Sequence, residues 1–152
     1  DITPFGMRAM MSLRLDRYFG YWMSEYSPDN PAAETGLDRF ISFTKNTDFI
    51  GRSAAEAERE TGPSRRLAAF IVDADDADVH GYEPIWLEGK VQGFCTSGGY
   101  SHFAGASIAQ GFLPTERLQE GLEVEIEILG KMRPARLTIV PLFDPEGARL
   151  RG

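Results

Sequence analysis

The feature that most constrains the fold is a pair of strand-like stretches, residues 91–101 and 107–114, joined through glycines. The segment VQGFCT at residues 91–96 alternates two sets of side chains, a period-two pattern typical of a strand with one buried and one wetter face. Gly98 and Gly99 lack a Cβ and tolerate positive φ, so we expect them to reverse the chain. The sequence therefore predicts an antiparallel hairpin inside a β-rich domain.

Four further strand-like segments lie around this hairpin, at residues 67–72, 82–87, 122–129 and 133–140. The segment LEVEIEIL at 122–129 alternates apolar and acidic residues without exception, which places its apolar side chains in a core and its glutamates in water. Antiparallel pairing with the next segment brings Arg133 and Arg136 near the acidic row. Six short strands separated by glycine turns predict a small closed antiparallel barrel.

Helical patterns precede the barrel. Residues 6–16 are rich in helix formers, and the three methionines of this segment recur at helical spacing, which favours a core-packing stripe. Residues 40–43 form an expected short strand. Residues 52–61 form a second predicted helix, a surface connector with its three alanines facing inward, which a Gly-Pro pair ends. The predicted fold class is α+β: N-terminal helices and a short strand, then a small antiparallel β-barrel of about six strands.

The composition is that of a globular chain: 152 residues, 42% hydrophobic and 26% charged, with a formal net charge of −7. No apolar run approaches the roughly 20 residues of a membrane-spanning helix, and a nucleic-acid surface needs a clustered basic face. We therefore expect neither a membrane nor a nucleic-acid partner. The single cysteine, Cys95, excludes an internal disulfide and suits a reducing, cytoplasmic compartment. Because the chain opens at Asp1, we expect it to be part of a longer protein.

Sequence motifs for catalysis and metal binding are absent. The acidic tract at residues 73–78, with His80, lacks the ligand spacing of a calcium loop, so a solvated acidic loop is favoured over a metal site. Ser101 and His102 are adjacent in one loop, where a nucleophile and its base seldom point at each other. Cys95 lies in an apolar strand without an adjacent base and is expected to be an inert core thiol. We predict no catalytic and no metal-binding residue in this chain.

An aromatic run, YFGYWMSEY, occupies residues 18–26. Such a density of rings either fills a seam of the core or stacks on a flat ligand. Packing is the favoured interpretation, and stacking remains the alternative.

The central hairpin resembles a known family. Its segments GFCTSGGYS and SIAQGFLP are similar to G-x-x-T-S-G-x-Y-S and S-I-A-x-G-[YF]-[VL]-P in the C-terminal domain of the aminomethyltransferase family, the T-protein of the glycine cleavage system. Further segments match in the family's order: SLRLD at 12–16, PAAETGL at 31–37, DFIGR at 48–52 and RRL at 65–67. The resemblance extends along the chain and is nearest to the C-terminal region of dimethylglycine and sarcosine dehydrogenases.

This resemblance implies one-carbon transfer to tetrahydrofolate. In such proteins an upstream FAD domain oxidises an N-methyl amine to an iminium, which a folate amine attacks to give methylenetetrahydrofolate. By resemblance, residues 1–62 are the end of the folate-binding domain with a connector helix, its catalytic aspartate lies before Asp1, and residues 63–152 are the C-terminal barrel. The expected partners are a small-molecule folate and the upstream domains of the same chain, and FAD is not expected to bind this chain.

The resemblance also implies candidate folate contacts at Trp22, Glu34 and Arg39. Trp22 falls where the dehydrogenase branch has a tryptophan, and Glu34 matches the glutamate of the family's N-P-L-E-A-G-L. Arg39 stands where T-proteins have a tryptophan, and we expect it to meet the folate glutamate tail. Two T-protein features are missing, an arginine at the position of Met10 and a C-terminal tyrosine. The alternative is a stand-alone T-protein-like module that binds folate or has a structural role without transfer activity.

Overall fold

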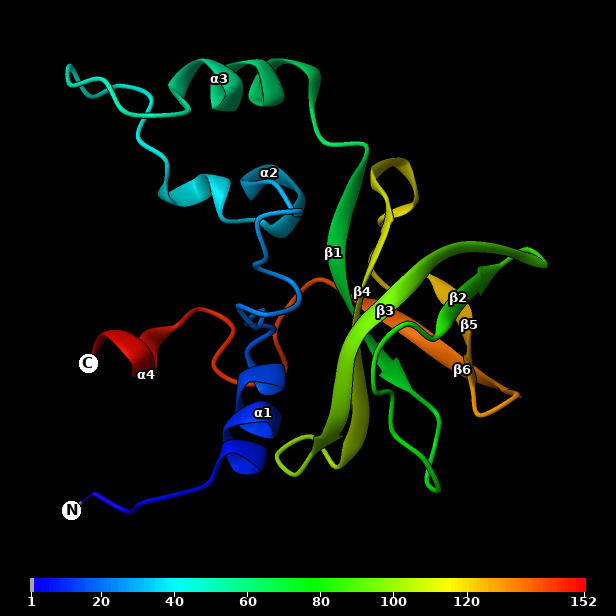
Figure 1. Ribbon diagram of the computed structural model, residues 1–152. Coiled ribbons are helices and arrows are strands. Elements are labelled where there is room, and N and C mark those ends of the chain that lie inside the picture. Colours follow the sequence, from blue (N-terminus) through cyan, green and yellow to red (C-terminus); the bar gives the residue numbers. More distant parts are fainter. Residues whose placement is uncertain (1) are drawn as a thin grey trace.

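Six antiparallel strands close into a barrel in the computed structural model, which describes residues 2–152 (Figure 1). In barrel order they are β1 (Arg65–Val72), β4 (Ala106–Pro114), β3 (Lys90–Ser101), β2 (Pro84–Leu87), β5 (Glu123–Ile128) and β6 (Lys131–Thr138). Alternate side chains point inward and fill the interior, among them the fully buried Phe70, Ile85 and Ile126. The predicted six-stranded barrel is confirmed.

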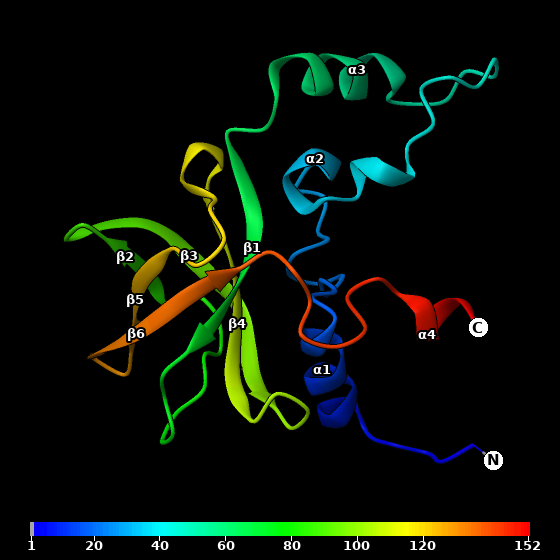
Figure 2. The same cartoon turned by 180° about the vertical axis from the view of Figure 1, so that it is seen from behind.

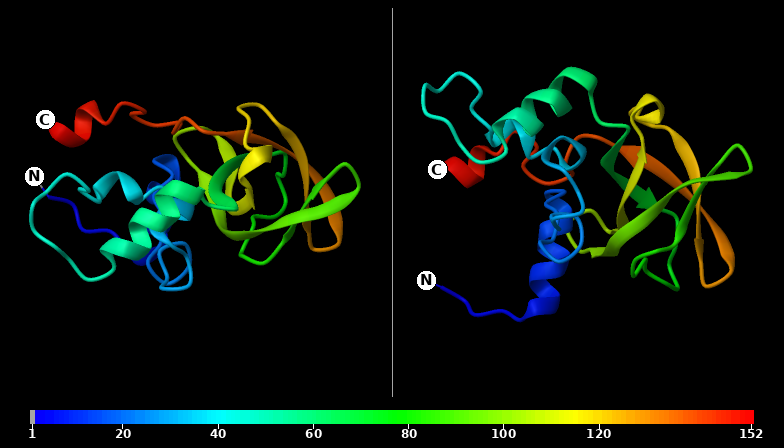
Figure 3. Two further views of the ribbon diagram at one scale, coloured as in Figure 1. Left: turned by 90° about the horizontal axis from the view of Figure 1, so that it is seen from above. Right: turned by 45° about the horizontal axis from the view of Figure 1, so that its top comes forward.

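The helices are α1 (Met7–Asp16), α2 (Ala32–Thr35), the 3-10 turn η1 (Asp38–Phe40), α3 (Arg52–Thr61), the 3-10 turn η2 (Thr115–Arg117) and α4 (Ala148–Arg151). Seen from behind, both chain ends lie on the α1 side of the molecule (Figure 2). From above, the barrel is a ring, and the N-terminal helices and the C-terminal tail lie beside it (Figure 3). The two ends of the chain therefore flank the same side of the barrel.

Strand β4 is covered on both faces, and every residue from Ser107 to Leu113 is buried. Ala109 and Leu113 belong to the barrel core. The opposite face of β4 meets the N-terminal segment, where Arg14 donates a hydrogen bond to Gln110. A strand buried on both faces is apolar or uncharged at successive positions, which explains the segment SIAQGFL.

The predicted chain reversal at Gly98 and Gly99 is wrong. Strand β3 continues through both glycines in register with β4, and the chain turns at residues 102–105 instead. Close packing is the reason for glycine at the first position: a Cβ on Gly98 would lie 2.6 Å from the Cβ of Val79 and 2.9 Å from the carbonyl oxygen of Ile108. A glycine inside a strand commonly marks such a close approach.

The expected strand at residues 40–43 is also wrong. Phe40 ends η1, and the chain after it is irregular. Arg52 donates to the backbone carbonyls of Phe43 and Lys45, at 2.9 and 3.2 Å. Within the expected strand, the Phe43 carbonyl is therefore satisfied by a guanidinium rather than by a neighbouring strand.

The methionine stripe of α1 does not pack into the core. Met7 and Met10 are exposed, whereas Leu15 is 1% exposed, because only the last turn of α1 is buried against the barrel. Helix α3 has its predicted limits, but Ala54 and Ala57 are exposed, since α3 lies away from the barrel (Figure 1). These positions were predicted from periodicity alone, which says nothing about whether a partner surface is present.

The cross-strand charge prediction is confirmed in part. Arg136 lies opposite Glu123, as expected. Arg133 lies opposite Ile126 and bonds Asp76 of the acidic loop instead. That loop is therefore tied to β6.

Helix α1 packs on β3 and β4, and α2 packs on β1. The division of the chain between residues 62 and 63 stays a prediction. Within residues 2–152, no helix has both the length and the apolar character needed to cross a bilayer.

Replacing the buried leucine at the end of α1 tests how this helix is seated. We expect Leu15→Ala to lower the free energy of unfolding by about 2–5 kcal/mol, because it leaves a cavity between α1 and the barrel. The matched control is Leu13→Ala on the same helix, where the side chain is 55% exposed and the expected change is within about 0.5 kcal/mol. Urea denaturation measures both, and equal losses would contradict the packing described above.

The two glycines of β3 provide a second test. Gly98→Ala should lower the free energy of unfolding by about 1–3 kcal/mol, because its Cβ meets backbone and Val79. Gly99→Ala should change it much less, since its Cβ meets only Leu15 Cδ1, at 3.4 Å. Neither glycine has a positive φ. Similar thermal unfolding of the two variants would count against close packing at Gly98.

The thiol of Cys95 should be unreactive in the folded protein. Burial, with a smaller contribution from the nearby Glu83 carboxylate, raises the pKa of this thiol, so the reactive thiolate is disfavoured. We expect an aromatic disulfide reagent to titrate one thiol only after denaturant is added. Modification of the native protein faster than its global unfolding would show that Cys95 is accessible.

Candidate functional site

A cavity of about 600 Å³ lies where the loop after α1, helix α2, strand β1 and the C-terminal tail meet. Its lining includes three aromatic residues and three cations: Tyr18, Phe19, Tyr26, Arg17, Arg39 and Arg66. The volume is that of a small-molecule site. Aromatic walls with guanidinium groups suit a flat ligand that carries negative charge.

Arg17 ties the C-terminal tail to the cavity. Its Nη1 donates to the carbonyl oxygen of Phe143 at 3.1 Å and lies 3.5 Å from the Asp144 carboxylate. Pro141 and Pro145, on either side of these two residues in the chain, line the cavity wall. The positive charge of Arg17 is thus paired with the Asp144 carboxylate within the protein.

Arg39 carries the least engaged charge of the three arginines. Arg66 donates to the carbonyl oxygen of Ala33 at 3.2 Å and lies 3.8 Å from Asp38. Arg39 is exposed and rests over the ring of Phe40, with 4.9 Å between its Cζ and the ring centroid. Within residues 2–152 it has no carboxylate partner. A ligand anion at the cavity mouth would therefore find this guanidinium available.

Glu34 shares the cavity with Arg39, but its carboxylate is already engaged. Its Oε2 lies 2.8 Å from Nε of Arg65, whose Nη2 donates to Asn30 at 3.1 Å. This pair fastens α2 to the start of β1. Trp22, the third predicted contact, lies apart from the cavity lining and is 69% exposed. The structure thus brings together two of the three predicted residues.

The tyrosines of the cavity were not singled out as site residues from the sequence. Tyr18 and Tyr26 are half-buried, and the Tyr18 hydroxyl lies 3.4 Å from Thr138 Oγ1. Burial raises the pKa of Tyr18. Tyr18 also has a positive φ of 56°, a conformation that no sequence pattern predicted. The signal available was the aromatic run itself, for which a ligand-stacking role was the alternative interpretation.

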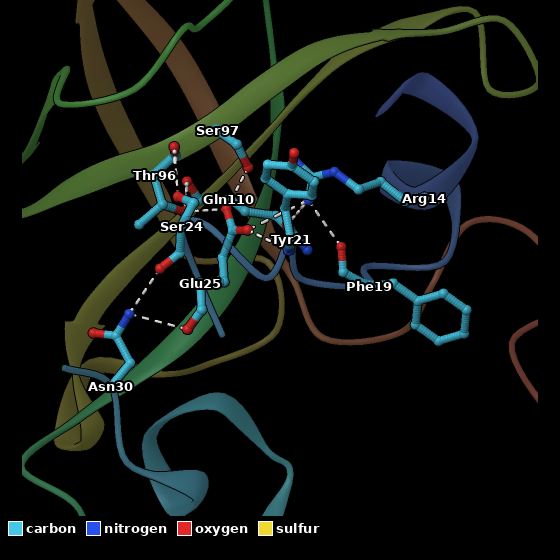
Figure 4. Close-up of polar contacts among 9 residues, drawn as sticks. All are labelled: Arg14, Phe19, Tyr21, Ser24, Glu25, Asn30, Thr96, Ser97 and Gln110. Atoms are coloured by element: carbon cyan, nitrogen blue, oxygen red, sulfur yellow. Dashed lines mark hydrogen bonds and ion pairs between the residues drawn. The ribbon is translucent and has the colours of Figure 1, made fainter. Parts of the chain in front are cut away.

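A polar network with a buried carboxylate at its centre includes two residues of the cavity lining, Phe19 and Gln110 (Figure 4). Glu25 is fully buried at its centre, and Nη1 of Arg14 lies 3.5 Å from its carboxylate. Nη1 of Arg14 also donates to the cavity-lining Gln110 and to the carbonyl oxygen of Phe19, both at 2.9 Å. Burial lowers the pKa of Arg14, and the Glu25 carboxylate opposes that shift. The network joins α1, the aromatic loop and β4.

Ser101 and His102, the adjacent pair noted in the sequence, have other partners in the structure. Ser101 is fully buried and donates a hydrogen bond to the Asp16 carboxylate. The ring of His102 packs edge-on against the ring of Tyr100, with 5.1 Å between the two ring centroids. The hydroxyl is therefore committed to Asp16. Residues 2–152 hold no cluster of three or more side chains that could bind a metal ion.

Another hollow, of about 790 Å³, lies on the flank of the barrel beside Trp86. Its lining includes Asp73, Glu123 and Glu125, so its field disfavours an anionic ligand. None of the three predicted contact residues lines it.

Comparison with known proteins identifies relatives along the chain. It is 41% identical to "Dimethylglycine dehydrogenase, mitochondrial" of Mus musculus over 99% of its own length and 17% of that protein's. It is 31% identical to an aminomethyltransferase of Nostoc sp., over 93% of this chain and 38% of the relative. It is also 30% identical to the "Pyruvate dehydrogenase phosphatase regulatory subunit, mitochondrial" of Mus musculus, over 93% of this chain and 18% of the relative. The chain thus spans less than two fifths of each of these relatives.

The fold is shared with a solved structure, the glycine cleavage system aminomethyltransferase T from Bartonella henselae. The TM-score is 0.84 at 23% sequence identity, over 92% of this chain and 39% of that one. Residues 65–144, which include all six strands, match the family model described as "Glycine cleavage T-protein C-terminal barrel domain". This match covers more than half of the 152 residues, and the chain therefore belongs to the family of the glycine cleavage T-protein C-terminal barrel domain.

Proposed function

We propose that this chain is the C-terminal part of an enzyme that transfers a one-carbon unit to tetrahydrofolate, in a protein of the dimethylglycine or sarcosine dehydrogenase type. The observation that carries the proposal is the cavity that joins three aromatic residues to the uncompensated charge of Arg39. The 41% sequence identity with the dimethylglycine dehydrogenase of Mus musculus, over 99% of this chain, supports the choice of protein type. The chain's role is to bind and orient the folate.

The lining residues fit different parts of such a ligand. Flat rings of a folate can lie against the aromatic side chains of Tyr18, Phe19 and Tyr26. The carboxylates of its glutamate tail match the Arg39 guanidinium, which presents several N–H donors in one plane. Tetrahydrofolate, when bound, supplies the amine that accepts the carbon.

The proton-handling group of this reaction is not among the residues described above. On the family's pattern it is an aspartate that precedes Asp1, in a region that would also contain the FAD domain. We accordingly expect the isolated chain to be inactive and the upstream domains to be its structural partners.

A reducing compartment suits Cys95, and the cytoplasm remains our expectation for this protein.

A second function, binding or regulation without transfer, has one observation in its favour. A relative that is 30% identical over 93% of this chain is named as a regulatory subunit of a phosphatase. A T-protein-like module of this kind would keep the cavity but lack the upstream catalytic residues. Folate binding without one-carbon transfer by the full-length protein would favour this alternative.

Calorimetric titration with a stable reduced folate, 5-formyltetrahydrofolate, tests the leading proposal on the full-length protein and on this chain. Arg39→Ala in the full-length protein should weaken binding about three- to tenfold, because one partly solvated charge-assisted contact is lost. Arg39→Lys should retain part of the affinity. Arg117→Ala is the control, since Arg117 lies near Glu88 and outside the cavity.

Saturable binding with loss on Arg39→Ala alone would support a folate site at this cavity. Unchanged affinity of Arg39→Ala would remove Arg39 from the site. If 5-formyltetrahydrofolate binds neither the full-length protein nor this chain, the folate proposal itself is wrong.

A further inference from the structure

We propose that Glu25 is a positioning residue for the cavity, acting through the loop formed by residues 17–26. This loop contributes Arg17, Tyr18, Phe19 and Tyr26 to the wall. Glu25 itself does not line the cavity and is fully buried. The identity of the ligand rests on the proposed function, whereas the positioning of the wall rests on the contacts below.

Both carboxylate oxygens of Glu25 are engaged. Oε2 accepts the backbone N–H of Tyr21 at 2.6 Å, which closes a turn within the loop. Oε1 accepts the hydroxyls of Thr96, at 2.6 Å, and of Ser97, both on β3 (Figure 4). The first contact shapes the loop, and the other two fasten it to the barrel. The anchor on β3 is at a register shift between Cys95 and Ser97, where a bulge re-aims side chains.

Arg14 extends this anchor to the wall. Its Nη1 lies 3.5 Å from Glu25 and donates to the carbonyl oxygen of Phe19 and to Oε1 of Gln110. Phe19 and Gln110 both line the cavity. Nε and Nη2 of Arg14 are buried without a hydrogen-bond partner among residues 2–152, so its charge depends on Glu25. Loss of the Glu25 charge would therefore leave the buried Arg14 guanidinium without its carboxylate partner.

Tyr26 is held by packing on Gly20. A Cβ on Gly20 would lie 2.5 Å from Cε1 of Tyr26 and 2.9 Å from the Cβ of Glu25. The Tyr26 ring therefore occupies the space that a larger residue at position 20 would need. Asn30 adds a brace, since its amide donates to the carbonyl oxygens of Ser24 and Glu25 at 2.9 and 3.0 Å. The cavity-lining ring thus follows the placement of its neighbour Glu25.

A carboxylate is required at this position. Three donors converge on Glu25, and an ionised carboxylate accepts at both oxygens. A glutamine has one acceptor oxygen, and its amide NH₂ would face a donor. Glu25→Gln keeps the shape of the side chain while removing both the charge and one acceptor, which makes it a sharp test.

The experiment measures hydrogen exchange by mass spectrometry on the ligand-free full-length protein, and 5-formyltetrahydrofolate binding by calorimetry. In Glu25→Gln, exchange in residues 17–26 should rise about tenfold or more, because the bonds that close the loop are charge-assisted. Folate affinity should fall at least about fivefold, with exchange in β5 and β6 unchanged. Two milder variants guard against misfolding: Ser97→Ala removes one anchor, and Gly20→Ala displaces Tyr26 without altering charge.

The matched control is Ile126→Val, a core substitution in β5 remote from the loop. It should lower global stability and leave both the exchange of residues 17–26 and the folate affinity unchanged. A folded Glu25→Gln protein with wild-type exchange in the loop would overturn the proposal, as would faster exchange with wild-type affinity. If the wild-type protein does not bind folate, the proposed function fails, and the exchange of residues 17–26 decides the positioning role by itself.

Discussion

The seam between the N-terminal segment and the outer face of β3 and β4 is the contact on which the rest of the structure depends. An apolar outer face of a barrel strand has to be covered, and Leu15 does so at the end of α1. The polar members of the seam, Glu25 and Arg14, find their partners on β3 and β4, at Thr96, Ser97 and Gln110. Apolar cover supplies the driving force, and the buried polar groups make the seating specific.

The cavity is a product of that seam. The loop that leaves α1 is fastened to β3, and its aromatic side chains line the cavity together with residues of β1. Arg17 extends from the same loop to the tail at Phe143 and Asp144, which closes the other side. One short loop therefore connects the barrel, the N-terminal helices and the C-terminal tail around a single cavity, and its anchor on β3 positions the part of the wall that the loop contributes.

The segments that resemble the T-protein family acquire a physical meaning in this arrangement. Ser97 and Ser101 of the segment TSGGYS each donate to a buried carboxylate, Glu25 and Asp16. Ser12, at the start of SLRLD, donates to the carbonyl oxygen of Tyr100. Two motifs far apart in the sequence are thus the two sides of one seam. Residues of the two family motifs therefore join the barrel to the preceding segment, and this junction positions the part of the cavity wall that the segment contributes.

By itself, the sequence determined the six strands, the helix at residues 52–61 and, through the family resemblance, the choice of Glu34 and Arg39 as candidate contacts, both of which line one cavity. Alternation between glycine turns is a local property, and it survives folding because it decides which side of a strand is apolar. Only the tertiary structure decided that Gly98 lies inside a strand, that Glu25 is buried and that the aromatic run borders a cavity. These features depend on residues far apart in the chain, such as Glu25 and Ser97, which are 72 positions apart. Periodicity reports near neighbours in sequence, whereas burial and hydrogen bonding are set by neighbours in space.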